Sequence, residues 1–413
     1  MKEDIIRRWP LLYRAGALSM GGYVAFLLAF KGTALYNFSL AILIVCILIL
    51  CYRNKDALCL PNKFFMMPYG VFAGGLFLSS LVQGELDNIK EVLHYLYLTL
   101  PLFIMYIGGR CFGREDIIYR AFAFGGFVTS VVCVVAYFHP EAWMEGRFSP
   151  ESHPNVTVQL LALPIPFLIM ACYRLKQSRL WCALNILSLT IILAAVWLTR
   201  SRGGIAGLLA GGLTLLVLYY PVLKYRWSYK KTVAVSSLLA VVVSALIVFI
   251  SANVFDRAHS NQGRLYLMYA AVNMFKDHPV CGIGYDNWNR EYLNYIHPQS
   301  QELHLTHAHN DLLNMLATTG VLGAGGYVIF SVFMWLYLMK RIVRQPKELM
   351  LWAMLWMYMS VYIHGMVDIS IQYNQSAKML FGMLGLVLAL ADKRLEETPT
   401  LESNFQDLHD DAG

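Results

Sequence analysis

The chain has 413 residues, of which 58% are hydrophobic and only 14% are charged. Soluble domains usually carry about 25% charged residues, so this composition excludes a soluble globular protein. The net charge is +7, but in a membrane protein the side on which the cations lie is more informative than their sum. The predicted fold class is therefore an all-α polytopic membrane protein.

Apolar runs of about 18 to 25 residues, long enough to cross a bilayer as helices, recur along the chain. We predict about twelve transmembrane helices, the first of which is an uncleaved span rather than a signal peptide. Their expected bounds are 11–30, 33–52, 64–82, 92–109, 118–138, 156–173, 180–198, 203–223, 232–252, 312–339, 349–367 and 379–391.

This layout predicts four segments. Residues 1–253 should form nine transmembrane helices with short loops, and residues 254–311 should form one long polar loop that carries short interfacial helices and the catalytic motifs. Residues 312–391 should form the last three spans. The acidic residues 392–413 are typical of a disordered cytoplasmic tail.

The distribution of Lys and Arg predicts the orientation. Twelve spans put both termini on one side, and that side holds 23 of the 33 Lys and Arg residues. Cytoplasmic loops are enriched in these residues, so we expect both termini in the cytoplasm and the long loop outside. Most of the ten external cations gather in loop 138–155, in turn 199–202 and in the long loop. This clustering runs against the charge rule and suits an external site for an anion.

The turn Thr199-Arg200-Ser201-Arg202 joins two predicted spans and precedes two glycines. A guanidinium is always charged and pairs with two phosphate oxygens at once. Arg202 and Arg200 are therefore candidates to hold a phosphate group. Two arginines that only reach toward lipid headgroups would show the same spacing.

A second arginine motif, Gly263-Arg264, lies near the start of a predicted amphipathic helix in the long loop. Such a helix would lie in the plane of the membrane interface, with Arg264 directed into a cavity and the helix N-terminus adding donors for an anion. An interfacial helix with an exposed arginine is the alternative. In loop 138–155, Arg147 would add to the cations and Asn155 would cap the next helix.

The long loop ends in His307-Ala-His309-Asn310. A neutral imidazole suits proton transfer from a hydroxyl, so His309, and after it His307, are candidates for a base; solvated loop histidines are the alternative. Histidines two residues apart do not share a helical face, and no nearby carboxylate pattern completes a site, so we expect no metal. His364 and Asp368, one turn apart near the eleventh span's outer end, suit a buried polar pair with a structural role.

These motifs are predicted to lie on one face of the membrane. Arginines on one side of a cavity and a base on the other suit a reaction in which a hydroxyl attacks carbon and a lipid-linked phosphate or diphosphate leaves. The arginines would neutralise the leaving group, and a histidine would accept the proton. No nucleotide is available outside the cytoplasm, so an activated lipid is the expected donor.

The order of the motifs resembles that of the O-antigen ligase and polymerase superfamily. The resemblance runs from Arg147 to Gly323, and the chain is similar in length to O-antigen ligases. The segments that carry it are Thr199-Arg-Ser-Arg202-Gly-Gly, Gly263-Arg264 with Pro279-x-x-Gly-Ile-Gly284, and His309-Asn310-Asp-Leu-Leu with Thr319-Gly-Val-Leu-Gly323.

The resemblance implies a GT-C-like glycosyltransferase architecture. It implies an inverting enzyme that ligates undecaprenyl-diphosphate-linked O-antigen to lipid A-core on the periplasmic face of the bacterial inner membrane, without metal, ATP or another cofactor. Expected partners are this donor lipid, the lipid A-core acceptor and membrane lipids, with no nucleic acid. An O-antigen polymerase with the same donor, a protein O-oligosaccharyltransferase and, from another class, a solute transporter are the alternatives.

The resemblance also implies roles for single residues. Arg202 and Arg264 would bind the donor diphosphate, and His309 would activate or position the acceptor hydroxyl. It identifies no partner for His309. Second choices for substrate binding are Arg200, His307, Arg147 and Asn310.

Overall fold

The computed structural model describes residues 8–29, 33–54, 59–151, 153–253, 258–300 and 306–397. These ranges are mostly helical, and ten of their helices are long and apolar enough to cross a membrane by length and composition. The predicted all-α polytopic class is confirmed.

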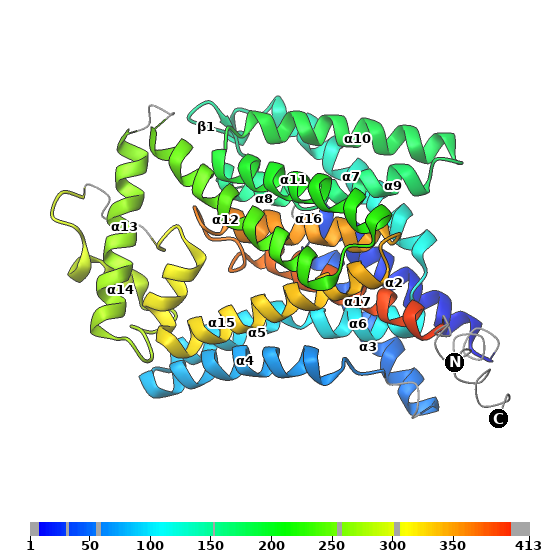
Figure 1. Cartoon of the computed structure of the whole chain (residues 1–413), viewed down its shortest axis with the longest axis horizontal. Coiled ribbons are helices and arrows are strands. Elements are labelled where there is room, and N and C mark those ends of the chain that lie inside the picture. The colour runs from blue at the N-terminus through cyan, green and yellow to red at the C-terminus, as the bar shows by residue number, and fades with distance from the viewer. Residues whose placement is uncertain are drawn as a thin grey trace.

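The helices form an elongated bundle (Figure 1). One short antiparallel hairpin interrupts it, in which Trp143 lies opposite Phe148 and Met144 opposite Arg147. The elements in chain order are α2 (Pro10–Leu28), α3 (Thr33–Arg53), α4 (Lys63–Gln83), α5 (Leu86–Thr99), α6 (Pro101–Phe112), α7 (Glu115–Tyr137), η2 (Pro140–Ala142), β1 (Trp143–Met144), β2 (Arg147–Phe148), α8 (Pro154–Ala162), α9 (Ile165–Arg174), α10 (Arg179–Leu198), α11 (Arg202–Tyr225), α12 (Tyr229–Asn253), α13 (Ala258–Asp277), α14 (Trp288–Tyr295), α15 (Asp311–Arg344), α16 (Leu349–His364) and α17 (Asn374–Glu397).

Each of the twelve predicted spans coincides with helical structure, but two of them are broken. The fourth is divided into α5 and α6 at Pro101, and the sixth is divided into α8 and α9 at Pro164. Proline lacks the backbone N–H that a continuous helix needs and crowds the preceding turn. The ninth and eleventh predicted spans coincide with α12 and with the shorter α16, which are not among the ten.

The C-terminal boundary differs from the prediction. Helix α17 continues to Glu397, past the predicted end of the last span at residue 391. Residues 392–397, predicted to begin a disordered tail, are helical because they pack against the bundle. Asp392 accepts hydrogen bonds from the hydroxyls of Tyr106 and Tyr337 at 2.7 and 2.9 Å. The predicted tail beyond residue 397 lies outside the described residues.

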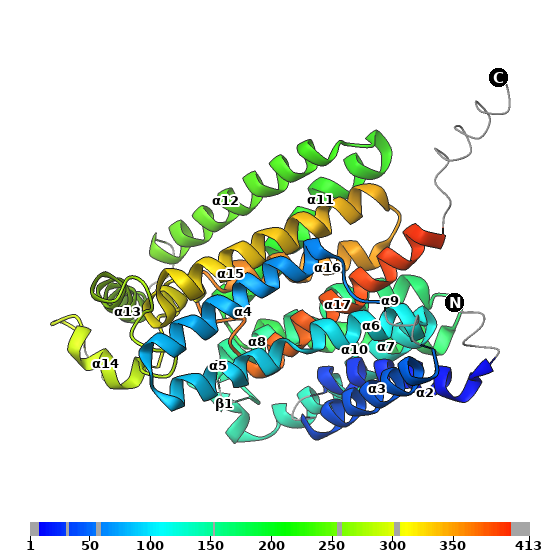
Figure 2. The same cartoon turned by 90° about the horizontal axis from the view of Figure 1, so that it is seen from below.

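Two helices from the long loop, α13 and the shorter α14, lie at one end of the bundle. Helix α13 runs across this end, and the turned view keeps α13 and α14 there (Figures 1 and 2). Helix α2 begins and α17 ends at the opposite end. An orientation across the spanning helices agrees with the predicted interfacial helix.

Close packing of α11 against α16 places the start of one beside the end of the other. Gly203, Gly207 and Gly211 recur at every fourth position of α11 and face α16. A Cβ atom on Gly207 would lie only 2.6 Å from the Ser360 carbonyl oxygen, and one on Gly211 would lie 2.6 Å from that of Trp356. Small residues allow helix backbones to approach in this way within membranes.

A kink in α15 anchors the long loop. Gly320 has φ 60° and ψ −160°, a conformation that glycine tolerates best. The backbone of the Pro279 to Gly284 segment pairs with the kinked turn, because the N–H of Val321 donates to the carbonyl of Pro279 at 2.9 Å and the N–H of Gly284 donates to that of Thr318 at 3.0 Å. This glycine motif therefore fixes the polypeptide that follows α13.

Adjacent glycines of α4 provide a test of the packing. A Cβ atom on Gly75 would clash with the Leu322 carbonyl oxygen of α15, whereas one on Gly74 would meet nothing within 4 Å. We expect Gly75→Ala to destabilise the protein by about 1–3 kcal/mol through overpacking, and Gly74→Ala to be neutral or slightly stabilising. Thermal unfolding in detergent measures both variants, and equal melting temperatures would contradict the packing.

Candidate active site

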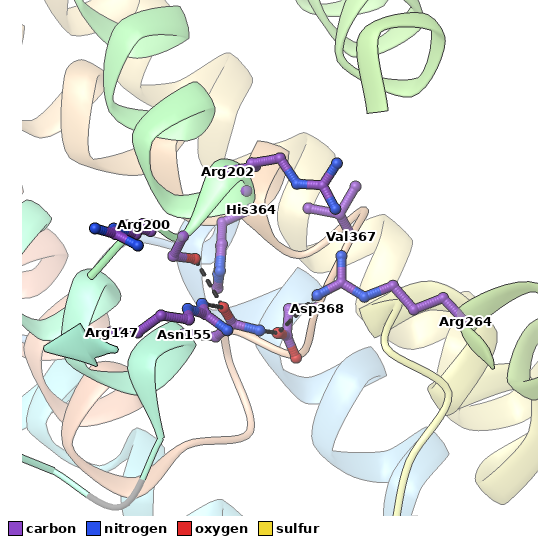
Figure 3. Close-up of a pocket in the computed structure, with 10 residues that line it drawn as sticks. Arg147, Asn155, Arg200, Arg202, Arg264, His364, Val367 and Asp368 are labelled. Carbon is purple, nitrogen blue, oxygen red and sulfur yellow. Dashed lines mark hydrogen bonds and ion pairs between the residues drawn. The ribbon is translucent and has the colours of Figure 1, made fainter. Parts of the chain in front are cut away.

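A polar pocket with an empty volume of about 350 Å³ lies where α11 begins and α16 ends, beside Arg264 of α13. Residues from five separate parts of the chain contribute to its wall, and Figure 3 draws them. The lining residues are Arg147, Asn155, Arg200, Ser201, Arg202, Gly203, Arg264, His364, Val367 and Asp368.

Asp368 is the centre of the polar contacts at this pocket. Its carboxylate is buried, with a side-chain exposure of 4%, and one oxygen, Oδ1, lies 2.9 Å from Nδ1 of His309 and 3.6 Å from Nε2 of His307. The other oxygen, Oδ2, accepts a hydrogen bond from Asn155 and lies 3.9 Å from Nη2 of Arg264. One carboxylate thus joins α8, α13, the segment before α15 and the loop after α16.

These contacts determine the charge of Asp368. Burial raises the pKa of this carboxyl, but the two adjacent imidazoles, of which His309 is hydrogen-bonded to it, outweigh burial and hold the pKa well below its usual value. An ionised carboxylate only accepts hydrogen bonds. Nδ1 of His309 is therefore the donor in this pair, and Nε2 is the ring nitrogen left to accept a proton.

The backbone at His309 is unusual. Its φ is 49°, in the left-handed region that non-glycine residues rarely adopt and that is often found at functional sites. Asn310 holds the next turn, because its Oδ1 accepts from the N–H of Leu313 at 2.9 Å and its Nδ2 donates to the carbonyl of Met366 at 2.9 Å. Asn310 therefore caps α15 and ties it to the loop that carries Asp368.

The predicted arginines reach the pocket in different ways. Arg202, the first residue of α11, and Arg264 of α13 extend from opposite sides toward the space beside Val367 and Asp368 (Figure 3). Arg200 lines the pocket, but its guanidinium points away from Asp368. The structure thus places Arg202 and Arg264 in the wall of this pocket, with His309 bound to Asp368 of the same wall.

Arg147 supports the wall of the pocket. Its Nε donates to the carbonyl of Thr199 at 3.0 Å, and its Nη2 donates to Oδ1 of Asn155 at 3.2 Å. The hydroxyl of Ser201 donates to that same amide oxygen at 2.8 Å. Through these bonds Arg147 connects the β1–β2 hairpin to the turn before α11 and to the start of α8.

Two predictions about helix starts are wrong. His153, rather than Asn155, is the N-cap of α8, and its Nδ1 accepts from the N–H of Asn155 at 3.2 Å. The Asn155 side chain instead faces Asp368 and Ser201. Helix α13 begins at Ala258, six residues or about 9 Å before Arg264, so Arg264 contributes its side chain rather than a helix N-terminus.

Asp368 is a functional candidate in the structure, whereas the sequence analysis gave it a structural role in a buried pair with His364. The expected pairing with His364 is not observed, because Nδ1 of His364 lies 2.7 Å from Oγ of Ser370 while Asp368 faces His309. Nε2 of His364 is buried without a hydrogen-bond partner among the described residues. The usable signal was an acidic residue at the edge of a membrane span, which is by default a functional candidate.

The sequence predicted that no carboxylate would complete a metal-ligand set with the histidines, and the structure contradicts this, because Asp368 lies beside both. One ligand atom each from His307, His309 and Asp368 lie within 4.8 Å of one another, and the histidine rings are 4.3 Å apart between centroids. Three protein ligands of these types suit a catalytic zinc ion. The charges oppose this, because Arg264 lies beside the same carboxylate and Arg202 lines the same pocket, and both would repel a dication.

We therefore expect the chain to work without a resident divalent ion. Elemental analysis of protein purified without chelator should find far less than one equivalent of zinc, and a chelator should leave the activity of the protein unchanged. His307→Ala provides the control, because it removes one ligand of the set. One equivalent of zinc in the wild type that this variant loses, together with inactivation by the chelator, would contradict the expectation.

The fold and this pocket define a polytopic membrane protein with a cation-lined site at one end of its bundle. Residues 186–328 match the family model described as O-antigen ligase, a range that includes Arg202, Arg264 and His309 but ends before Asp368. This segment of the chain is therefore similar to the O-antigen ligase family. No curated protein matches the chain significantly.

Proposed function

We propose that this protein is an inverting glycosyltransferase that ligates undecaprenyl-diphosphate-linked O-antigen to lipid A-core, completing lipopolysaccharide. The observation that supports this best is His309 paired with the buried Asp368 at the pocket that Arg202 and Arg264 also reach. A base and two permanent cations at one site match a reaction that deprotonates a hydroxyl and releases a diphosphate.

Arg202 and Arg264 bind the donor diphosphate in this proposal. Each guanidinium offers a planar set of donors that pairs with two phosphate oxygens. Because the two side chains approach from opposite sides (Figure 3), together they can hold one diphosphate between them. Negative charge grows on the leaving group as the bond to the sugar breaks, and fixed cations in a site shielded from water stabilise that charge strongly.

His309 activates or positions the acceptor. The hydroxyl oxygen of lipid A-core attacks the anomeric carbon, the bond from that carbon to the diphosphate oxygen breaks, and Nε2 of His309 takes the hydroxyl proton. Asp368 stabilises the resulting imidazolium through Nδ1. A general base of this kind contributes about 10²- to 10⁴-fold, and a single displacement inverts the anomeric centre.

The second-choice residues receive supporting roles. Asn310 positions His309 by capping α15, and Arg147 holds the turn that presents Arg202. His307 lies 3.6 Å from Asp368 and adds a donor beside the same carboxylate. Arg200 points away from Asp368 (Figure 3) and would contact a more distal part of the donor lipid.

We place the pocket on the periplasmic face of the inner membrane and both termini in the cytoplasm. Helix α2 begins and α17 ends away from the end that α13 crosses (Figure 1). With twelve spans, the membrane side that holds both termini carries 23 of the 33 Lys and Arg residues. The charge rule assigns the side richer in these residues to the cytoplasm.

A lipopolysaccharide gel of a deletion strain tests the function. Loss of the O-antigen ladder, with intact lipid A-core and accumulated lipid-linked polymer, is expected. The wild-type gene should restore the ladder, whereas His309→Ala should insert into the membrane normally and fail to restore it, because no base remains. His278→Ala, at an exposed histidine of the same loop, should restore the ladder fully.

Other outcomes of the same gel identify the competing functions. A band of core with a single repeat in the deletion strain indicates an O-antigen polymerase, since capping of core would still proceed. An unchanged ladder would contradict ligation and favour a transporter. A normal ladder with His309→Ala would remove the proposed role of His309.

A further inference from the structure

A second hollow lies on the bundle away from the polar pocket. Its empty volume is about 1470 Å³, and its walls come from α9, α11 and α16. The polar pocket lies at Arg202, where α11 begins, and at His364, where α16 ends, whereas this hollow lies along the later part of α11 and the beginning of α16. Most of its lining is apolar or aromatic, including Leu215, Tyr219, Leu223, Trp352 and Trp356.

The sequence of α11 explains why the hollow forms where it does. On α11, the residues at four-residue spacing begin with Gly203, Gly207 and Gly211 and continue with the larger Leu215, Tyr219 and Leu223. Near the polar pocket the glycines let α11 and α16 pack closely. Further along, Leu215, Tyr219 and Leu223 line the hollow. The ring centroids of Tyr219 and Trp352 are 5.3 Å apart, so this aromatic pair forms part of its wall.

Two cations add charge to this apolar surface. Arg174, at the end of α9, and Lys347, two residues before α16, line the hollow and are exposed. Arg174 lies 5.9 Å above the ring of Tyr119, and neither cation forms a salt bridge with a described residue. Cations next to a long apolar surface between spanning helices are typical of sites for anionic lipid headgroups.

We propose that this hollow binds one anionic phospholipid from the leaflet opposite the polar pocket. Its phosphate contacts Arg174 and Lys347, and its acyl chains lie against Leu215, Tyr219 and Trp356. Aromatic side chains suit the boundary between headgroups and acyl chains. The inference does not depend on the proposed glycosyl transfer, because the hollow shares no residue with the polar pocket.

A bound lipid at this position also stabilises the site at the other end of the same helices. Helix α11 begins with Arg202, the loop after α16 carries Asp368, and α8, which precedes α9, carries Asn155. Acyl chains packed among α9, α11 and α16 would hold their relative positions. Binding to the folded state alone raises the melting temperature with lipid concentration.

Native mass spectrometry of the full-length, delipidated protein tests the proposal. The protein is titrated with phosphatidylglycerol or with phosphatidylcholine of identical acyl chains. The wild type should retain phosphatidylglycerol about tenfold more tightly, and the double variant Arg174→Gln/Lys347→Gln should lose about tenfold in that affinity. Its affinity for phosphatidylcholine should fall much less, because that headgroup is zwitterionic and carries no net charge.

Two further variants complete the test. Lys230→Gln/Lys340→Gln removes two exposed cations outside the hollow and should keep wild-type affinity for phosphatidylglycerol. Leu215→Trp fills the hollow and should weaken both lipids. Equal affinity of the wild type for the two lipids, or unchanged phosphatidylglycerol binding by the Arg174 and Lys347 variant, would overturn the proposal.

Discussion

One buried carboxylate organises the polar end of this molecule. Removing an ionised aspartate from water costs several kcal/mol unless opposite charges and hydrogen bonds compensate. Asp368 obtains that compensation from His309, Asn155 and Arg264, which belong to three different parts of the chain. Folding around this charge therefore assembles the site, and the same contacts that stabilise the carboxylate orient the imidazole.

The helical bundle supplies the rigid positions that this arrangement needs. Glycines of α11 let it pack against α16, so that Arg202 begins beside the loop that carries Asp368. The kink at Gly320 leaves backbone groups of α15 to pair with the segment after α13, which fixes the loop that bears Arg264. Phosphate-binding cations and the candidate base are thus presented by packed helices, and preorganised charge of this kind is what stabilises a leaving group.

Much of the fold and part of the site could be predicted from the sequence. Span positions follow from the length of apolar runs, and Arg202, Arg264 and His309 follow from short motifs in a known order. The role of Asp368 could not be predicted, because 59 residues separate it from His309 and 213 from Asn155. The contact of both His307 and His309 with one carboxylate could not be predicted either, because it depends on the left-handed backbone at His309. The breaks before α6 and α9 were missed because apolar composition continues through their prolines.

The account depends most on the pairing of Asp368 with His309, and the rate of sugar transfer by purified Asp368→Asn measures it directly. Asparagine keeps the shape but not the charge, so it would neither hold the proton on Nδ1 nor stabilise the imidazolium. With a lipid-linked donor and lipid A-core, the rate should fall by about 10²-fold or more, while Asp286→Asn, at an exposed loop position, stays at the wild-type rate. A folded Asp368→Asn protein that transfers sugar within a few-fold of the wild type would contradict the account.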